Sequence, residues 1–79
     1  MEFDKLKEII AGVLSVDPNE ITEETTFMDD LGADSLDMFQ IAIRIEEEFQ
    51  LELHAEQLEP VKTAGDALVM LRSAIDEKE

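Results

Sequence analysis

Apolar side chains recur at steps of three and four in three stretches of the chain, which is the spacing typical of amphipathic helices. The first stretch predicts a helix that begins near the N-terminus and runs to about Ser15. Its apolar positions are Phe3, Leu6, Ile10, Val13 and Leu14. Asp17-Pro18-Asn19 follows directly and is expected to stop this helix, because a proline inside a helix removes a backbone hydrogen bond.

A second helix is predicted from Ser35 to about Gln50. Asp34 is suited to be its N-cap, and Asp37, at the third helical position, would complete a capping box. Gly32 supplies the turn that leads into this helix.

The third stretch predicts a last helix that opens at Thr63, with Asp66 completing another capping box. Its apolar face consists of Ala64, Ala67, Leu68, Leu71 and Ile75, and residues 76–79 are expected to fray. One short turn of helix is expected from Ala55 to Glu59, closed by Pro60.

A long polar segment joins the first two helices and has few apolar anchors, among them Phe27, Met28 and Leu31. Structureless loops of this length are uncommon in compact domains and are usually functional. The predicted fold is therefore one all-α domain over residues 1–79. It is a small four-helix bundle, with three main helices, one short helix and a long first loop.

The chain of 79 residues carries 21 acidic and only 6 basic side chains, a formal charge of -15. This charge argues against binding to nucleic acid or to anionic lipid and favours partners with basic protein surfaces. No apolar segment approaches the ~20 residues of a membrane span, so no membrane insertion is expected. We expect a cytoplasmic monomer.

The chain lacks the residues that most enzymes need. It has no cysteine, one histidine (His54), no Gly-x-Ser-x-Gly elbow and no Gly-x-x-x-x-Gly-Lys loop. A calcium loop that began at Asp29 would place Leu31 where an EF-hand needs Asp or Asn, so no metal site is predicted. We expect no enzyme activity, and any thiol chemistry must come from an added group.

Ser35 is the candidate functional residue. Its hydroxyl is predicted to lie at the start of the second helix, near unpaired N–H groups and the positive end of the helix dipole. That position favours an attached phosphate.

The second helix carries two apolar stripes. The inner stripe, Met38, Ile41, Ala42, Ile45 and Phe49, is wide enough to face a core. The outer stripe, Leu36, Phe39 and Ile43, is flanked by Asp37, Glu46 and Glu47. Either this helix packs against neighbours on two sides, or the outer stripe is a docking surface for a partner with an apolar socket and basic rim. We favour docking for Leu36 and Ile43, and both interpretations stay open for Phe39.

Taken together, these motifs resemble the acyl carrier proteins of bacterial type II fatty acid synthesis. The segment Asp30-Leu31-Gly32-Ala33-Asp34-Ser35-Leu36-Asp37 resembles the phosphopantetheine attachment signature of that family. The segment Ile45-Glu46-Glu47-Glu48-Phe49 is similar to the end of the family's second helix. Residues 16–27 resemble its long first loop, and residues 63–67 the start of its last helix.

The resemblance implies that a phosphopantetheinyl transferase joins the phosphopantetheine of coenzyme A to Ser35, leaving a terminal thiol that carries acyl groups as thioesters. This would explain the missing cysteine. The resemblance also implies that Asp34, Leu36 and Asp37 contact the transferase, and that Leu36, Ile43, Glu46 and Glu47 are recognised by acyl-processing enzymes. The candidates for lining an acyl pocket, chosen for apolar character, are Phe27, Ala42, Ile45, Leu58, Val61 and Leu68.

The chain departs from the family at His54, where a proline is common, and at Pro60, where Lys or Glu is usual. These departures bear on whether the third helix forms. Phe39 and Gln40 replace a smaller apolar residue and a frequent Glu, a change that we expect to shift partner preference. The predicted function is to carry acyl intermediates in fatty acid synthesis. The alternatives are a carrier for a polyketide or other specialised acyl group, and an unmodified acidic interaction module.

Overall fold

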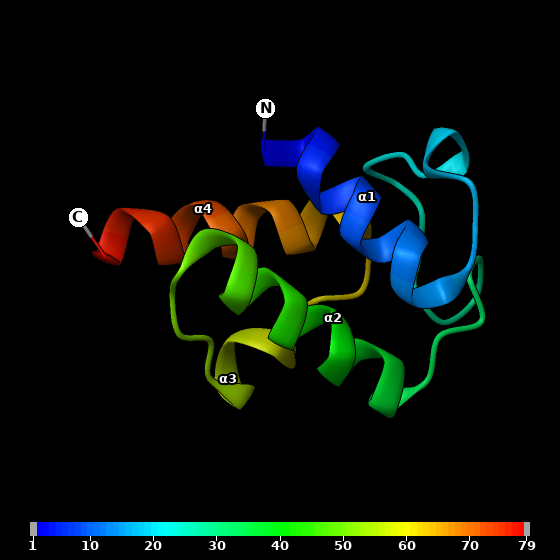
Figure 1. Cartoon of the computed structure of the whole chain (residues 1–79). Helices are drawn as coiled ribbons and strands as arrows, with labels where there is room; N and C mark the ends of the chain where they lie inside the picture. The colour runs from blue at the N-terminus through cyan, green and yellow to red at the C-terminus, as the bar shows by residue number, and fades with distance from the viewer. Residues whose placement is uncertain (1, 79) are drawn as a thin grey trace.

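The three periodic stretches of the sequence form the three long helices of the structure, a computed structural model that describes residues 2–78 (Figure 1). The helices are α1 (Glu2–Leu14), α2 (Ser35–Phe49), α3 (Ala55–Leu58) and α4 (Ala64–Lys78). A short 3₁₀ turn, η1 (Pro18–Glu20), lies in the long first loop. No named strand occurs in the described part of the chain, so the predicted all-α four-helix bundle is confirmed.

The core is formed where α1 packs against α2 and α4, while α3 packs against α4 (Figure 1). Each long helix turns one apolar face inward, and the largest fully buried side chains are Leu6, Ile10, Phe27, Ile45 and Leu71. Burying a side chain of this size contributes about 1.5–3 kcal/mol. Phe27 is the member of this group that comes from the first loop, so the loop shares the core of the bundle.

Two expectations about helix ends have different outcomes. The short third helix forms despite Pro60 and ends at Leu58, with Glu59 as its C-cap. The expectation that the C-terminal residues fray was wrong for residues 76–78, because α4 continues to Lys78. Ala74 is buried and Ile75 packs against the core, which holds this end in place. Glu79 lies outside the described residues.

Backbone hydrogen bonds attach the first loop to the segment that precedes α4. The Phe27 N–H donates to the Lys62 carbonyl at 3.0 Å, and the Ala64 N–H donates to the Thr25 carbonyl at 2.9 Å. These bonds flank a single antiparallel bridge between residues 26 and 63. The first loop is therefore fixed in place and does not behave as a free connection.

Gly65 allows the closest approach between the loop and α4. Its N–H donates to the Glu23 carbonyl at 2.9 Å, and a Cβ atom at this position would lie 2.8 Å from that carbonyl oxygen. Any larger residue would have to push the two backbones apart. The second residue of α4 is therefore a glycine for a packing reason.

Candidate functional site

The segment that leads into α2 begins with a reciprocal pair of hydrogen bonds. The Thr26 N–H donates to Asp30 Oδ2 at 2.9 Å, and the Asp30 N–H donates to Thr26 Oγ1 at 3.0 Å. The bonds from Thr26, the backbone one first, lower the pKa of Asp30 below its ordinary value. The ionised Asp30 carboxylate and its bonds to Thr26 therefore stabilise this turn.

The second half of this turn is closed by backbone bonds alone. The Gly32 N–H donates to the Met28 carbonyl at 3.1 Å, and the Ala33 N–H donates to the Phe27 carbonyl at 2.8 Å. Gly32 has a φ of 67°, a conformation that glycine adopts at no steric cost. We call residues 26–34 the presenting turn, because it fixes where α2 begins.

Asp34 and Asp37 form the capping box that the sequence predicted. Asp34 Oδ1 accepts from the Asp37 N–H at 2.9 Å, and Asp37 Oδ2 accepts from the Asp34 N–H at 3.2 Å. Ser35 is the first helical residue and is exposed. Within the described residues, the N–H groups of Ser35 and Leu36 meet no hydrogen-bond acceptor. An exposed hydroxyl thus lies beside two free donors at a helix N-terminus.

The outer stripe of α2 is open to solvent. Leu36, Phe39 and Ile43 are 64%, 62% and 48% exposed. The interpretation that Phe39 packs against a second neighbouring element is therefore wrong. The inner stripe is confirmed, because Ile41, Ala42 and Ile45 are buried while Met38 and Phe49 are half-buried. One helix face is used by the core and the other is left free.

The acidic residues at the end of α2 have different structural roles. Glu46 is half-buried, and its Oε2 accepts from the Leu53 N–H at 2.8 Å, which holds the chain after the helix. Sequence analysis missed this role, since nothing in the spacing marks a bond across seven residues. Glu48 pairs with Lys5 of α1 at 3.0 Å, and this contact raises the pKa of Lys5. Glu47 is exposed.

The candidates for an acyl pocket are only partly brought together. Phe27 and Val61 line a cavity of about 320 Å³ between the presenting turn, α2 and the segment after α3. The same cavity is lined by Met28 and Met38, which sequence analysis did not assign to it. The sequence could have indicated Met38, because it follows Ser35 by one helical turn and therefore lies on the same side of the helix. The remaining candidates do not line this cavity: Ala42, Ile45 and Leu68 are buried and Leu58 is half-buried.

No helix in residues 2–78 combines the length and the apolar character that crossing a membrane requires. In the same range, no group of three or more His, Cys, Asp or Glu side chains is arranged to hold a metal ion.

Comparison with known proteins matches residues 4–68 to the family described as "Phosphopantetheine attachment site". Acyl carrier proteins from Clostridium perfringens strains SM101 and 13 are each 56% identical to this chain over 66 residues, which cover 84% of the chain and 87% of each relative. The chain belongs to the acyl carrier proteins. Its prosthetic group is 4′-phosphopantetheine, and it is a carrier and not an enzyme.

The start of α2 in this acyl carrier protein fits a group attached through a phosphate. The free N–H groups of Ser35 and Leu36 can approach phosphate oxygens, and the helix dipole favours negative charge there. When bound, the group supplies a terminal thiol for thioesters. The start of α2 would give such a group a fixed position, and Met38, one helical turn later, lines a cavity.

Proposed function

We propose that Ser35 is the attachment residue and that the protein carries acyl intermediates of fatty acid synthesis. In the attachment step, Ser35 Oγ forms an ester bond to the phosphorus of the pantetheine phosphate of coenzyme A. The pyrophosphate bond breaks, and the adenosine bisphosphate part leaves while the serine hydroxyl loses its proton. A phosphopantetheinyl transferase would bind both reactants.

The single observation that carries this proposal is the setting of Ser35 compared with the other serines. Ser15 follows the C-terminal end of α1 with a φ of 58°, and Ser73 lies in the middle of α4. Both are exposed, but neither has free N–H groups beside it at a helix N-terminus. The helix dipole contributes only about 0.3–1 kcal/mol to holding an anion, so the group has to be bonded covalently.

The outer stripe supplies a docking surface for the transferase and for acyl-processing enzymes. Its three apolar side chains are exposed and carry acidic residues at their edges, which suits partners with basic surfaces. We assign recognition to Asp34, Leu36, Asp37, Phe39, Ile43, Glu46 and Glu47. Asp34 and Asp37 act indirectly, because their carboxylates already cap the helix that presents Ser35.

The cavity lined by Phe27 and Val61 is the proposed opening of the acyl pocket. Each methylene buried there would contribute about 0.8 kcal/mol. Ala42, Ile45, Leu58 and Leu68 would line the deeper part, which requires the bundle to widen around a bound chain. Longer acyl groups are then expected to raise the melting temperature stepwise until the space is filled.

Attachment is tested by incubating the protein with coenzyme A and a promiscuous phosphopantetheinyl transferase, followed by intact-mass measurement. The expected result is a gain of one phosphopantetheine in the wild type and in Ser73→Ala, but none in Ser35→Ala. Circular dichroism would confirm that Ser35→Ala keeps its helices. A gain that persists in Ser35→Ala would overturn the assignment, and no gain in the wild type would favour an unmodified interaction module.

The pathway is tested by supplying the modified protein to a reconstituted type II fatty acid synthase. Chain elongation is expected at a rate comparable to that with the enzyme system's own carrier. Attachment without elongation would favour a carrier for a polyketide or another specialised acyl group. Sedimentation of the purified protein and fractionation of its host cells would test the proposed monomer and the cytoplasmic location.

A further inference from the structure

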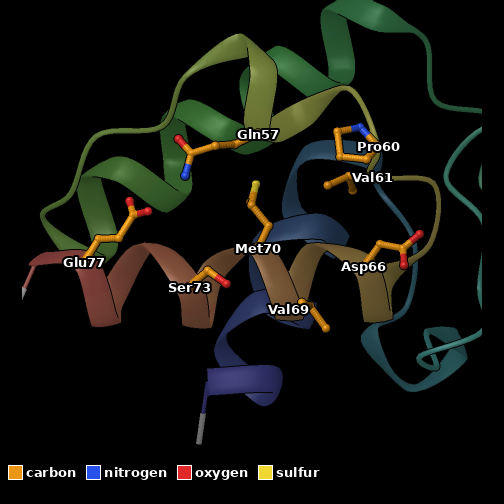
Figure 2. Close-up of a pocket in the computed structure, with 8 residues that line it drawn as sticks. All are labelled: Gln57, Pro60, Val61, Asp66, Val69, Met70, Ser73 and Glu77. Carbon is orange, nitrogen blue, oxygen red and sulfur yellow. The ribbon is translucent and has the colours of Figure 1, made fainter.

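A groove between α3 and α4 lies apart from Ser35 and shares one lining residue, Val61, with the cavity beside the presenting turn. It has a cavity volume of about 400 Å³, and its apolar part is formed by Pro60, Val61, Val69 and Met70 (Figure 2). The Met70 side chain points toward α3, and Val69 lies on the outer edge with 66% of its surface exposed. No residue of α2 lines this groove, so the outer stripe and the groove are separate surfaces.

The groove has a carboxylate at each end of its apolar centre. Asp66 and Glu77 are eleven residues apart on α4, or about 16 Å along the helix axis. Figure 2 shows them at opposite ends, with Met70 between. Asp66 Oδ2 accepts from the backbone N–H groups of Lys62 and Thr63, at 3.2 Å each, and these bonds lower the pKa of Asp66. Among the residues whose side chains are described, no Lys or Arg lines the groove, although the charge of nearby Lys62 also lowers the pKa of Asp66.

We propose that this α3–α4 groove binds a basic amphipathic helix of a partner protein. Such a helix would insert two apolar side chains, three or four residues apart, between α3 and α4. It would place Lys or Arg near Asp66 and Glu77, about three helical turns apart. A second copy of the chain fits poorly, because two molecules of formal charge -15 repel each other.

The proposal is tested with a synthetic peptide of about fourteen residues that has two lysines at each end and leucines three and four residues apart in its centre. A peptide of the same composition in scrambled order is the control. NMR titration of the isotope-labelled protein at low salt is expected to shift the amides of the groove, Val61, Val69 and Met70 above all. The scrambled peptide is expected to bind at least about tenfold more weakly.

Three variants distinguish peptide binding in the groove from nonspecific attraction between a basic peptide and an acidic protein. Val69→Lys is expected to weaken peptide binding about tenfold, because it adds a like charge and removes an exposed apolar contact. Glu77→Lys is expected to weaken it about fivefold, whereas Glu24→Lys, with the same charge change in the first loop, is expected to change it less than about twofold. Shifts centred on Leu36 and Ile43, or equal losses in the two glutamate variants, would overturn the proposal.

Other occupants of the groove would appear in two further measurements. A wild-type dimer in sedimentation that Val69→Lys dissociates would assign the groove to a second copy. Loading the protein with a dodecanoyl group and observing shifts at Val69 and Ser73 would assign it to the acyl chain. Either result would contradict a partner helix.

Discussion

The presenting turn and the segment from residue 50 to residue 63 both connect long helices, but they are held in different ways. The presenting turn combines a fully buried anchor, Phe27, with side-chain bonds between Thr26 and Asp30. The later segment contains α3, which has no buried residue. At its start, Gln57 Oε1 accepts from the His54 N–H at 2.8 Å, whereas two carboxylates cap the start of α2.

This difference matches two different tasks within one carrier. The residue that another enzyme must find needs a fixed position, and the polar network of the presenting turn provides it. An acyl chain that entered between the helices, as we propose, would need a wall that can move. A segment with few buried contacts has a low free energy of local opening. We therefore interpret α3 as the movable wall of the bundle and the presenting turn as its fixed part.

The largest expected effect is a difference in hydrogen exchange between the two regions. The amides of Gln57 in α3 and of Glu59, its C-cap, are expected to have opening free energies about 2–4 kcal/mol below that of Ala33 in the presenting turn. This corresponds to exchange about thirtyfold to a thousandfold faster. The measurement is amide exchange followed by NMR in the unloaded protein. Equal protection in both regions would remove the distinction.

A smaller effect is expected when the contact between the loop and α4 is crowded. Gly65→Ala would place a Cβ atom 2.8 Å from the Glu23 carbonyl oxygen, and we expect a loss of about 1–3 kcal/mol in unfolding free energy. Urea denaturation measures this loss.

Gly12→Ala is the matched control for that experiment. No atom lies within 4 Å of the added Cβ atom at Gly12, which sits in the interior of α1. Alanine there is expected to stabilise the protein by about 0.5–1 kcal/mol, because it has the higher helix propensity. If both variants changed the unfolding free energy in the same direction, the close approach at Gly65 would not explain the effect of Gly65→Ala.

Much of the fixed part could be predicted from the sequence, because its signals are local. Asp34 and Asp37 stand three residues apart before an apolar repeat, and that spacing gave both the capping box and the start of α2 at Ser35. The inner stripe followed from helical periodicity for the same reason. The chemistry of Ser35 depends on these local features, so the candidate attachment residue could be named without coordinates.

The parts that could not be predicted depend on contacts distant in sequence. The bond from Leu53 to Glu46, the approach of Gly65 to Glu23 and the α3–α4 groove each need helices already packed. Apolar character alone also did not indicate which of the pocket candidates line a cavity in this structure. It cannot distinguish Ile45, which is sealed in the core, from Val61, which lines two cavities.

Removing a helix cap is expected to lower the unfolding free energy more at α2 than at α3, with smaller changes than those above. Asp34→Ala is expected to lower the unfolding free energy by about 1 kcal/mol, since it deletes the side chain that accepts from the Asp37 N–H. Gln57→Ala at α3 is expected to cost less than about 0.5 kcal/mol. Asp34→Asn controls for the charge, because asparagine caps about as well as aspartate. Chemical denaturation gives all three values, and a larger loss at Gln57 than at Asp34 would reverse the comparison.

The smallest expected effect is the response of the presenting turn to acid. The pKa of Asp30 is lowered from 3.8 by its bonds to Thr26, so the ionised group stabilises the fold above pH 3.8. That contribution is expected to disappear as the pH falls through the lowered pKa.

The measurement compares melting temperatures of the wild type and Asp30→Asn from pH 7 to pH 2, with Asp29→Asn as the control for removing one negative charge nearby. The advantage of the wild type over Asp30→Asn should be constant from neutral pH down to about pH 5 and should shrink below about pH 4. An advantage that stayed constant down to pH 2 would mean that the ionised carboxylate does not hold the turn, and backbone bonds alone would then have to account for its fixed position.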